Sequence, residues 1–314
     1  MERISLDGQV AVVTGAGQGL GAEYARQLAA RGAAVVINDL PGSTRADAVV
    51  AEIEDAGGRA IASMHDVADR EDARRIVADA VEQLGGVHIL VNNAGILRPG
   101  LFEDLTERAI ESTIAVHLGS MFYVTQPAWD VMREQRYGRI VNISSTNSYG
   151  VEGLINYSAA KAGVIGFTHA LALEAIRSDV LVNAVMPNAI TEMAEQALTD
   201  NPIPRTLENT RFLDAYAAVG HCSEPARPAA LVTYLASREC TVTGEVYSQV
   251  GPRYSRVFLG VSDGWMSPEQ RPPSPEEVAE HFPQIREAEP FSIPTSVTED
   301  FVAVVPRLAG APSP

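Results

Sequence analysis

Short apolar runs alternate along the chain with longer segments whose apolar residues recur at helical spacing. The runs are rich in valine, isoleucine and alanine and occupy residues 10–15, 33–39, 60–66, 87–95, 139–145, 180–187 and 245–251. Segments such as 21–32 and 71–85 lie between them and end at a glycine, as helices commonly do. A strand of a parallel sheet is buried on both faces and therefore reads as a continuous apolar run. The pattern predicts an α/β fold, a doubly wound (Rossmann) sheet of seven parallel strands with helices on both faces.

The composition changes after residue 252. We therefore expect a main domain over 1–252 and a C-terminal extension over 253–314 that contains proline-rich patches. The sequence SPEE, which begins at Ser274, is a capping-box pattern and predicts one short helix over about 275–287. Aromatic side chains in the extension indicate that it packs on the domain or on a neighbouring subunit: Phe258, Trp265, Phe282, Phe291 and Phe301.

Composition narrows the classes of function. Of the 314 residues, 46% are hydrophobic and 20% are charged, which is ordinary for a globular protein. The net charge of −16 argues against a nucleic-acid partner, because affinity for phosphate backbones comes mainly from Lys and Arg. Neither a leader segment nor a membrane-spanning run is visible, so we expect a cytoplasmic protein with no membrane partner. Cys222, Cys240 and the six histidines lack metal-ligand spacing, so no metal site is expected.

Four glycines follow the first apolar run directly, in the sequence TGAGQGLG. Gly15, Gly17, Gly19 and Gly21 stand between a predicted strand and a predicted helix. Glycines there let the backbone approach a pyrophosphate, which the free N–H groups of the helix N-terminus can hold. No Gly-Lys-Ser/Thr follows, which excludes the phosphate loop of nucleotide triphosphatases. The context favours a dinucleotide-binding turn over a merely tight turn.

Asp39 ends the second predicted strand, about 20 residues beyond the glycine turn. A carboxylate at that place can accept hydrogen bonds from the adenosine ribose hydroxyls and would repel the extra phosphate of NADP. Taken alone, an Asp at the end of a strand is as well explained as a turn or helix-capping residue. Together with the glycine turn, it predicts NAD as the cofactor.

The stretch INYSAAK places Tyr157 and Lys161 four residues apart. On a helix these positions lie on one face, so the phenol and the ammonium group can address one point. The spacing permits catalytic chemistry but does not establish it.

These motifs occur in the order found in the short-chain dehydrogenase/reductase family. The chain resembles that family over about residues 5–250, through the glycine turn, Asp39, NNAG at 92–95, NISS at 142–145 and the Tyr157–Lys161 pair. Within the family, stretches such as VHLGSMFYVTQPAW and MPNAITEM are most similar to the (3R)-hydroxyacyl-CoA dehydrogenase unit of peroxisomal multifunctional enzyme type 2. That unit is similar in turn to 17β-hydroxysteroid dehydrogenase type 4 and bacterial relatives.

The resemblance implies roles for the catalytic residues. Tyr157 would exchange a proton with the substrate oxygen, and Lys161 would stabilise its phenolate and bind the nicotinamide ribose. A serine would donate a hydrogen bond to the same oxygen: counting along the strand selects Ser145, whereas counting back from Tyr157 selects Ser144. We expect Ser145, because the register of a strand is tighter than the length of a loop. His117 stands where most of the family has an asparagine that holds a water of the proton relay. It is either a relay residue or a hydrogen-bonded structural histidine.

The resemblance also implies the cofactor contacts. Asn188 departs from the glycine that most of the family has at its position, which puts the local backbone geometry in question. The implied NAD-binding residues are Gly15, Gln18, Gly19, Leu20, Gly21, Asp39, Leu40, Asp66, Val67, Asn93, Ala94, Gly95, Tyr157, Lys161, Pro187 and Thr191.

Residues 189–222 occupy the place of the family's substrate lid and mix apolar with charged side chains. The expected function is an NAD-dependent oxidoreductase that interconverts a secondary alcohol and a ketone on a bulky apolar substrate, a hydroxyacyl-CoA or a hydroxysteroid. A terpene or other alicyclic alcohol is the alternative substrate, and a lyase, an epimerase or a non-catalytic cofactor-binding protein is the alternative function. Family members pair through helices matching 104–135 and 155–177, which implies a homodimer or homotetramer. Five arginines are candidates for CoA phosphates: Arg98, Arg205, Arg211, Arg253 and Arg256.

Overall fold

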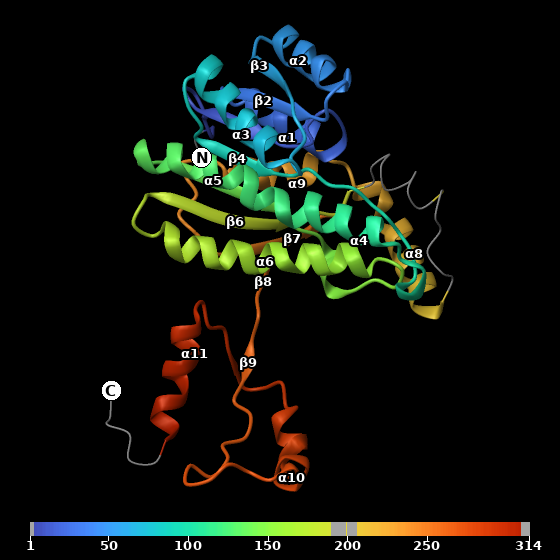
Figure 1. Ribbon diagram of the computed structural model, residues 1–314, viewed down its shortest axis with the longest axis vertical. Coiled ribbons are helices and arrows are strands. Elements are labelled where there is room, and N and C mark those ends of the chain that lie inside the picture. Colours follow the sequence, from blue (N-terminus) through green and yellow to red (C-terminus); the bar gives the residue numbers. More distant parts are fainter. Residues whose placement is uncertain (1–2, 190–198, 200–205, 309–314) are drawn as a thin grey trace. The chain divides into compact units, whose positions relative to one another are not determined.

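The computed structural model describes residues 3–189, 199 and 206–308 (Figure 1). The chain divides into two units, Met1–Arg256 and Val257–Pro314, and each is described by itself. No helix within the described ranges is long and apolar enough to cross a membrane.

An eight-stranded sheet forms the centre of the first unit, in the order β3-β2-β1-β4-β5-β6-β7-β8. The pairs from β3 to β7 are parallel. The predicted α/β class is thus confirmed, and the sheet has one strand more than the seven expected. Only two residues, Gly251 and Pro252, connect β7 to β8. So short a connection can join only antiparallel neighbours. The strands are β1 Val10–Val13, β2 Ala34–Asp39, β3 Arg59–Met64, β4 Ile89–Asn92, β5 Gly138–Ile143, β6 Val180–Met186, β7 Val246–Val250 and β8 Arg253–Val257.

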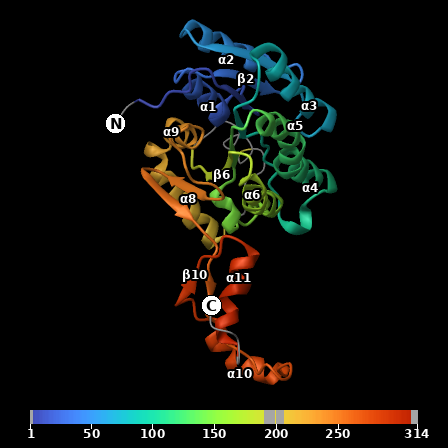
Figure 2. The same cartoon turned by 90° about the vertical axis from the view of Figure 1, so that its left-hand side faces the viewer.

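Helices cover both faces of this sheet, as the sequence predicts (Figure 2). One apolar core packs α1, α2 and α9 on the strands, and a second packs α3, α5 and α6 on the opposite face. Central strands are buried along their whole length, which explains their continuous apolar sequence. The helices are α1 Gly19–Ala29, α2 Arg45–Asp55, α3 Arg70–Asp79, α4 Glu107–Ile114, α5 Ser120–Glu134, α6 Ile155–Ala175, α8 Leu207–Val219 and α9 Ala226–Leu235.

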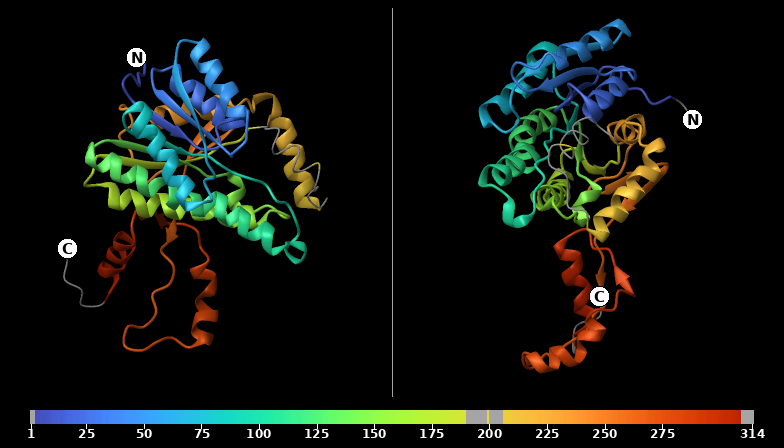
Figure 3. Two further views of the ribbon diagram at one scale, coloured as in Figure 1. Left: turned by 45° about the horizontal axis from the view of Figure 1, so that its top comes forward. Right: turned by 90° about the vertical axis from the view of Figure 1, so that its right-hand side faces the viewer.

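The carboxyl ends of the parallel strands meet at one edge of the sheet. Consecutive strands bring the glycine turn after β1, Asn93 after β4, Ser144 after β5 and Pro187 after β6 to that edge. The order in which successive strands are added to the sheet reverses between β1 and β4, the switch point at which doubly wound folds bind ligands. Figure 3 shows α8 in gold, the helix that follows the undescribed residues of the predicted lid.

The second unit contains the predicted helix and more. Helix α10, Pro275–Ile285, begins with the expected capping box, in which Ser274 accepts a hydrogen bond from the Glu277 N–H. The sequence did not predict the other elements, which are α11 (Val297–Val304) and the antiparallel pair of β9 (Val261–Ser262) and β10 (Phe291–Ser292).

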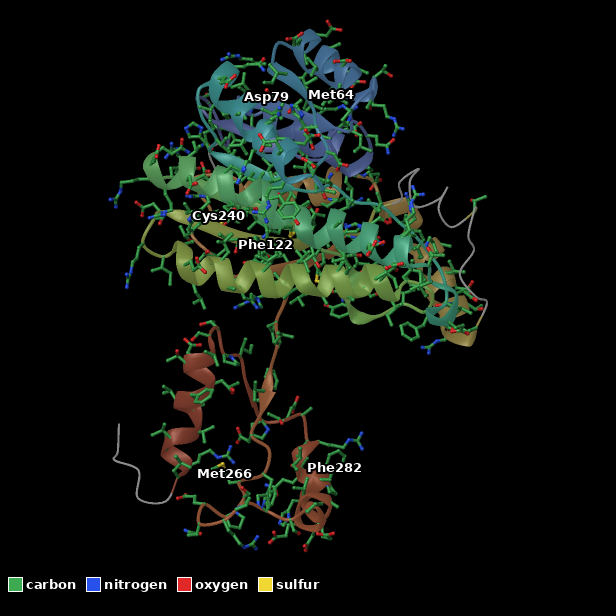
Figure 4. All side chains as sticks on the ribbon, in the orientation of Figure 1. Met64, Asp79, Phe122, Cys240, Met266 and Phe282 are labelled. Carbon is green, nitrogen blue, oxygen red and sulfur yellow. The ribbon has the colours of Figure 1, made fainter. Side chains whose placement is uncertain are left out.

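Within this second unit, Phe258 stacks on Phe291 and Trp265 stacks on His281. Phe282, which Figure 4 labels on α10, and Phe301 on α11 are exposed by 51% and 69% of their surface. The aromatic residues of the extension therefore pack only in part within their own unit.

Candidate active site

The glycine turn after β1 is pressed against the segment that follows β4. Gly15 has a φ of +60°, which favours glycine, and a Cβ placed on it would lie 2.9 Å from the Cα of Ala94. A Cβ on Gly21 would lie 2.3 Å from the Gly15 carbonyl oxygen, so α1 can begin directly beside the turn only because Gly21 has no side chain. These two glycines form the cradle that a pyrophosphate needs at a helix N-terminus.

Thr14 connects the same two strands through its side chain. Its hydroxyl accepts hydrogen bonds from the N–H groups of Asn93, at 2.9 Å, and Ala94, at 3.0 Å. Asn93 in turn donates through Nδ2 to the Thr14 carbonyl at 2.8 Å. Thr14 could not be singled out from the sequence, because a threonine at the end of a strand carries no signal of its own.

Asp39 lies beside the glycine turn, as predicted for a ribose-binding carboxylate. A Cβ on Gly17 would lie 2.1 Å from Asp39 Oδ2, so only glycine leaves that carboxylate in place. The carboxylate accepts hydrogen bonds from the Leu40 N–H at 2.8 Å and from the Ser43 hydroxyl at 2.7 Å. Ser43, which the sequence did not single out, thus fixes the orientation of Asp39.

The two serines after β5 have different partners. Ser145 forms a hydrogen bond with the Tyr157 hydroxyl, and its Oγ accepts another from the Asn147 N–H at 3.1 Å. Ser144 points into the protein and donates to the Lys161 carbonyl at 2.7 Å. The structure therefore places Ser145 beside Tyr157, the serine that the register of the strand selects.

Tyr157 and Lys161 share one face of α6. The Lys161 Nζ lies 5.8 Å from the centre of the Tyr157 ring and donates to the Ile143 carbonyl at 2.5 Å. Burial raises the pKa of Tyr157, and the hydrogen bond with Ser145 lowers it. Burial lowers the pKa of Lys161 to about 7. Both groups are thus displaced from their usual titration ranges, as is common at sites of proton transfer.

Lys161 is the only lysine in the chain, since the other members of the 24 Lys and Arg residues are all arginine. An arginine stays protonated in proteins, whereas a buried lysine can change its protonation state. The single lysine is therefore a signal of this site that is visible in the sequence alone.

His117 lies in a π-helical turn, Ala115–Gly119, and is 2% exposed. Its Nε2 is 2.6 Å from the carbonyl oxygen of Ile96 and 3.1 Å from the Ile96 nitrogen, and its ring meets Tyr157 edge to face at 4.9 Å. Burial, followed by the nearby charge of Lys161, lowers the pKa of His117 to about 3. The imidazole is therefore neutral near pH 7, and its buried Nδ1 has no partner among the described residues.

One cavity of about 1000 Å³ collects these groups. The predicted catalytic residues and all predicted cofactor residues line it except Thr191, which lies outside the described residues together with most of the predicted lid. Apolar side chains that the motifs did not identify complete the wall: Ile96, Leu97, Leu154, Phe212, Leu213 and Tyr216.

Hydrogen bonds join α8 to the loop before Tyr157 and to the segment after β6. Thr206 caps the start of α8 and donates through its hydroxyl to Glu152, in the loop before Tyr157, at 2.7 Å. Beyond the other end of α8, the Ser223 hydroxyl donates to the side chain of Asn188 at 3.1 Å. Asn188, the departure noted in the sequence, is thus part of a hydrogen-bonded connection.

The residues around the cavity fit a dinucleotide. Gly15 and Gly19 have positive φ angles of 60° and 57°, and the Gly15 and Gly17 positions leave no room for a side chain. A phosphate could lie at the N-terminus of α1, with Asp39 at the ribose end and Lys161 at the opposite end.

Comparisons with known proteins agree with this geometry. The family model for short chain dehydrogenases matches residues 9–202. The chain is also 40% identical, over 286 residues, to a short-chain type dehydrogenase/reductase of Mycobacterium tuberculosis, which covers 88% of this chain and 93% of that protein. The chain belongs to the short-chain dehydrogenase family.

Two further similarities relate this short-chain dehydrogenase to one enzyme. It is 33% identical over 317 residues to peroxisomal multifunctional enzyme type 2 of Mus musculus, across 96% of this chain and 40% of that protein. The full-length structure of the same enzyme from Drosophila melanogaster superposes with a TM-score of 0.78 at 30% identity, across 97% of this chain and 50% of that one. The resemblance to this enzyme is confirmed, although the chain spans half or less of its length.

Proposed function

We propose that the protein is an NAD-dependent oxidoreductase that interconverts a secondary alcohol and a ketone on a bulky apolar substrate. The observation that carries the proposal is the convergence of Ser145, Tyr157 and Lys161 on one cavity, with Asp39 in the same cavity. The first three residues suit proton exchange with a substrate oxygen, and the carboxylate suits a ribose without a phosphate.

In this mechanism Tyr157 moves the proton. When a ketone is reduced, the phenol donates its proton to the substrate oxygen, and when an alcohol is oxidised, the phenolate accepts it. Ser145 holds the same oxygen through its hydroxyl, and Lys161 stabilises the phenolate by its charge. NAD, when bound, supplies the centre that exchanges a hydride with the substrate carbon.

His117 has a supporting place in the proposed mechanism. Because its pKa is lowered to about 3, it does not donate a proton as an imidazolium ion near pH 7. Its ring contacts Tyr157, and its buried Nδ1 can take part in a hydrogen bond. We assign it to holding the phenol and a proton-relay water in place rather than to acid catalysis.

The substrate class follows from the wall opposite the cofactor residues. Phe212, Leu213 and Tyr216 on α8 line the cavity together with Leu97 and Leu154, so an acyl chain or a fused ring would meet apolar surface. The resemblance to multifunctional enzyme type 2 favours a (3R)-hydroxyacyl-CoA. A hydroxysteroid or a terpenoid alcohol fits the same apolar wall.

We also propose a homodimer or homotetramer that uses the helices α4, α5 and α6. Phe122 is 55% exposed and pairs edge to face with Phe167, and Ile110 and Leu173 are exposed by 40% and 46%. Exposed apolar side chains on these helices are compatible with a subunit interface. Sedimentation equilibrium of the parent protein and of Phe122→Asp tests this: a parent that sediments as a monomer contradicts the assignment.

The function is tested by incubating the purified protein with NAD, or in parallel NADP, and a panel of alcohols. The panel contains both enantiomers of 3-hydroxyacyl-CoAs, hydroxysteroids and terpenoid alcohols, and NADH formation is followed by absorbance. We expect NADH with at least one member and a preference for the (3R)-hydroxyacyl-CoA. Tight NAD binding without turnover of any member would overturn the dehydrogenase proposal and favour a binding protein.

A further inference from the structure

Two buried hydrogen bonds cross in opposite directions between the end of β5 and the second turn of α6. The Ser144 hydroxyl donates to the Lys161 carbonyl at 2.7 Å, and the Lys161 ammonium group donates to the Ile143 carbonyl at 2.5 Å. Residues 143 and 144 are thus bound to both ends of one lysine, its main chain and its side chain. We call this pair of hydrogen bonds the β5–α6 clamp.

The side chains of the clamp are almost completely buried. Ser144 and Lys161 are 2% and 3% exposed. The Ser144 N–H donates to the Val185 carbonyl at 2.8 Å, which fixes the serine main chain against β6. The Ser144 hydroxyl donates its single proton to the Lys161 carbonyl. A buried donor that lost this acceptor would lower the free energy of unfolding. Ser144 therefore holds the turn of α6 that carries Lys161.

We propose that Ser144 is a positioning residue that sets where the Lys161 ammonium group stands relative to Tyr157. This inference rests on the proposed function, because it assigns Lys161 the stabilisation of the Tyr157 phenolate. Ser144 does not reach the reacting atoms, since its proton is already donated to the Lys161 carbonyl. Its neighbour Ser145 forms the hydrogen bond with Tyr157, so the two serines divide positioning and substrate contact between them.

Loss of the hydrogen bond from Ser144 should move the ammonium group, because both hydrogen bonds of the clamp belong to the same residue. Lys161 is joined to the clamp through its own main chain, so a shift of the α6 turn moves Nζ away from Ile143. Burial lowers the pKa of Lys161 to about 7, so an ammonium group that gains contact with water regains part of its usual, higher pKa. A displaced ammonium group also stabilises the phenolate less, because the interaction falls with distance.

Substitution of Ser144→Ala tests the proposal, with Thr168→Val as the matched control. Thr168 is also fully buried on α6 and joins that helix to β5, since its hydroxyl accepts from Asn142 Nδ2 at 3.0 Å and donates to the Val164 carbonyl at 2.8 Å. We expect both variants to lower the melting temperature by a few degrees. Only Ser144→Ala should lower kcat, by about tenfold, and move the acid limb of alcohol oxidation about 0.5 unit or more to higher pH.

A second measurement needs no substrate. Because Lys161 is the only lysine, isotopic labelling of lysine gives one side-chain NMR signal, whose shift with pH reports the pKa of that group directly. We expect Ser144→Ala to raise this pKa and Thr168→Val to leave it within error of the parent value. The NMR measurement tests the role of Ser144 without any substrate, whereas the substrate panel tests the proposed function. The two proposals can therefore fail independently.

A Ser144→Ala variant whose lysine pKa, kcat and pH profile match those of Thr168→Val would overturn the inference. Ser144 would then contribute to stability alone. Changed kinetics with an unchanged lysine pKa would also contradict it, because the effect would not pass through Lys161.

Discussion

The end of the cavity near β1, β2 and β4 is lined by backbone turns, whereas the opposite wall is lined by side chains from α8 and neighbouring loops. At the first end, glycines bring segments so close that a Cβ would lie within 3 Å of another atom. At the second, α8 is joined to the loop before Tyr157 by the exposed hydrogen bond between Thr206 and Glu152. A binding surface made of main chain suits a cofactor that a whole family shares. A wall made of side chains, such as those of α8, suits a substrate that differs between family members.

Substitution of Tyr157→Phe should have the largest effect, because it removes the hydroxyl that exchanges a proton with the substrate oxygen in the proposed mechanism. We expect kcat to fall about 10³-fold, the usual scale for loss of a positioned acid or base. NAD binding, measured by calorimetry, should stay within about threefold of the parent value, since the glycine turn and Asp39 are untouched. Turnover that survives the substitution would remove Tyr157 from the mechanism.

Asp39→Ser is expected to change the cofactor half alone. The carboxylate would no longer accept hydrogen bonds from the ribose or repel the extra phosphate of NADP. We therefore expect the preference for NAD over NADP, measured as the ratio of their kcat/KM values, to fall about 100-fold, the scale of lost charged hydrogen bonds. The KM for the alcohol should change little, because Asp39 lies at the far end of the cavity. An unchanged ratio would place cofactor selection elsewhere.

Gly17→Ala tests the backbone side of the comparison. The new Cβ would lie 2.1 Å from Asp39 Oδ2 and would displace that carboxylate, so we expect NAD to bind about tenfold more weakly. Gly166→Ala on α6 is the control, since no atom lies within 4 Å of its new Cβ and alanine favours a helix. Equal NAD affinity in the two variants would mean that the turn tolerates a side chain.

Glu152→Ala should produce the smallest effect, confined to the substrate half. Loss of the acceptor for Thr206 loosens the start of α8, and we expect the KM for the alcohol to rise about threefold, the scale of an exposed charged hydrogen bond. Glu152→Gln, which keeps an acceptor oxygen, should restore most of the parent value. A matching rise in the Kd for NAD would contradict the division between the two halves.

The sequence predicted the parts of the site that depend on local pattern. Tyr157 and Lys161 were found because helical spacing places residues i and i+4 on one face and because the other motifs of the family precede them in order. The glycine turn and Asp39 were found because they follow predicted strands at fixed distances. Thr14, Ser43 and Glu152 were missed, since each acts by a hydrogen bond to a segment whose approach depends on the packed sheet or on a turn.

The sequence by itself determined the order of strands and helices along the chain and the end of the sheet that carries the candidate site, because these follow from periodicity, and the order of the motifs singled out Tyr157 and Lys161. Only the tertiary structure decided that Ser144 binds the Lys161 carbonyl and that the His117 ring lies, neutral, against Tyr157. Hydrogen-bond partners and pKa shifts arise from burial between elements distant in sequence. The pattern of residues along one segment carries no information about that burial.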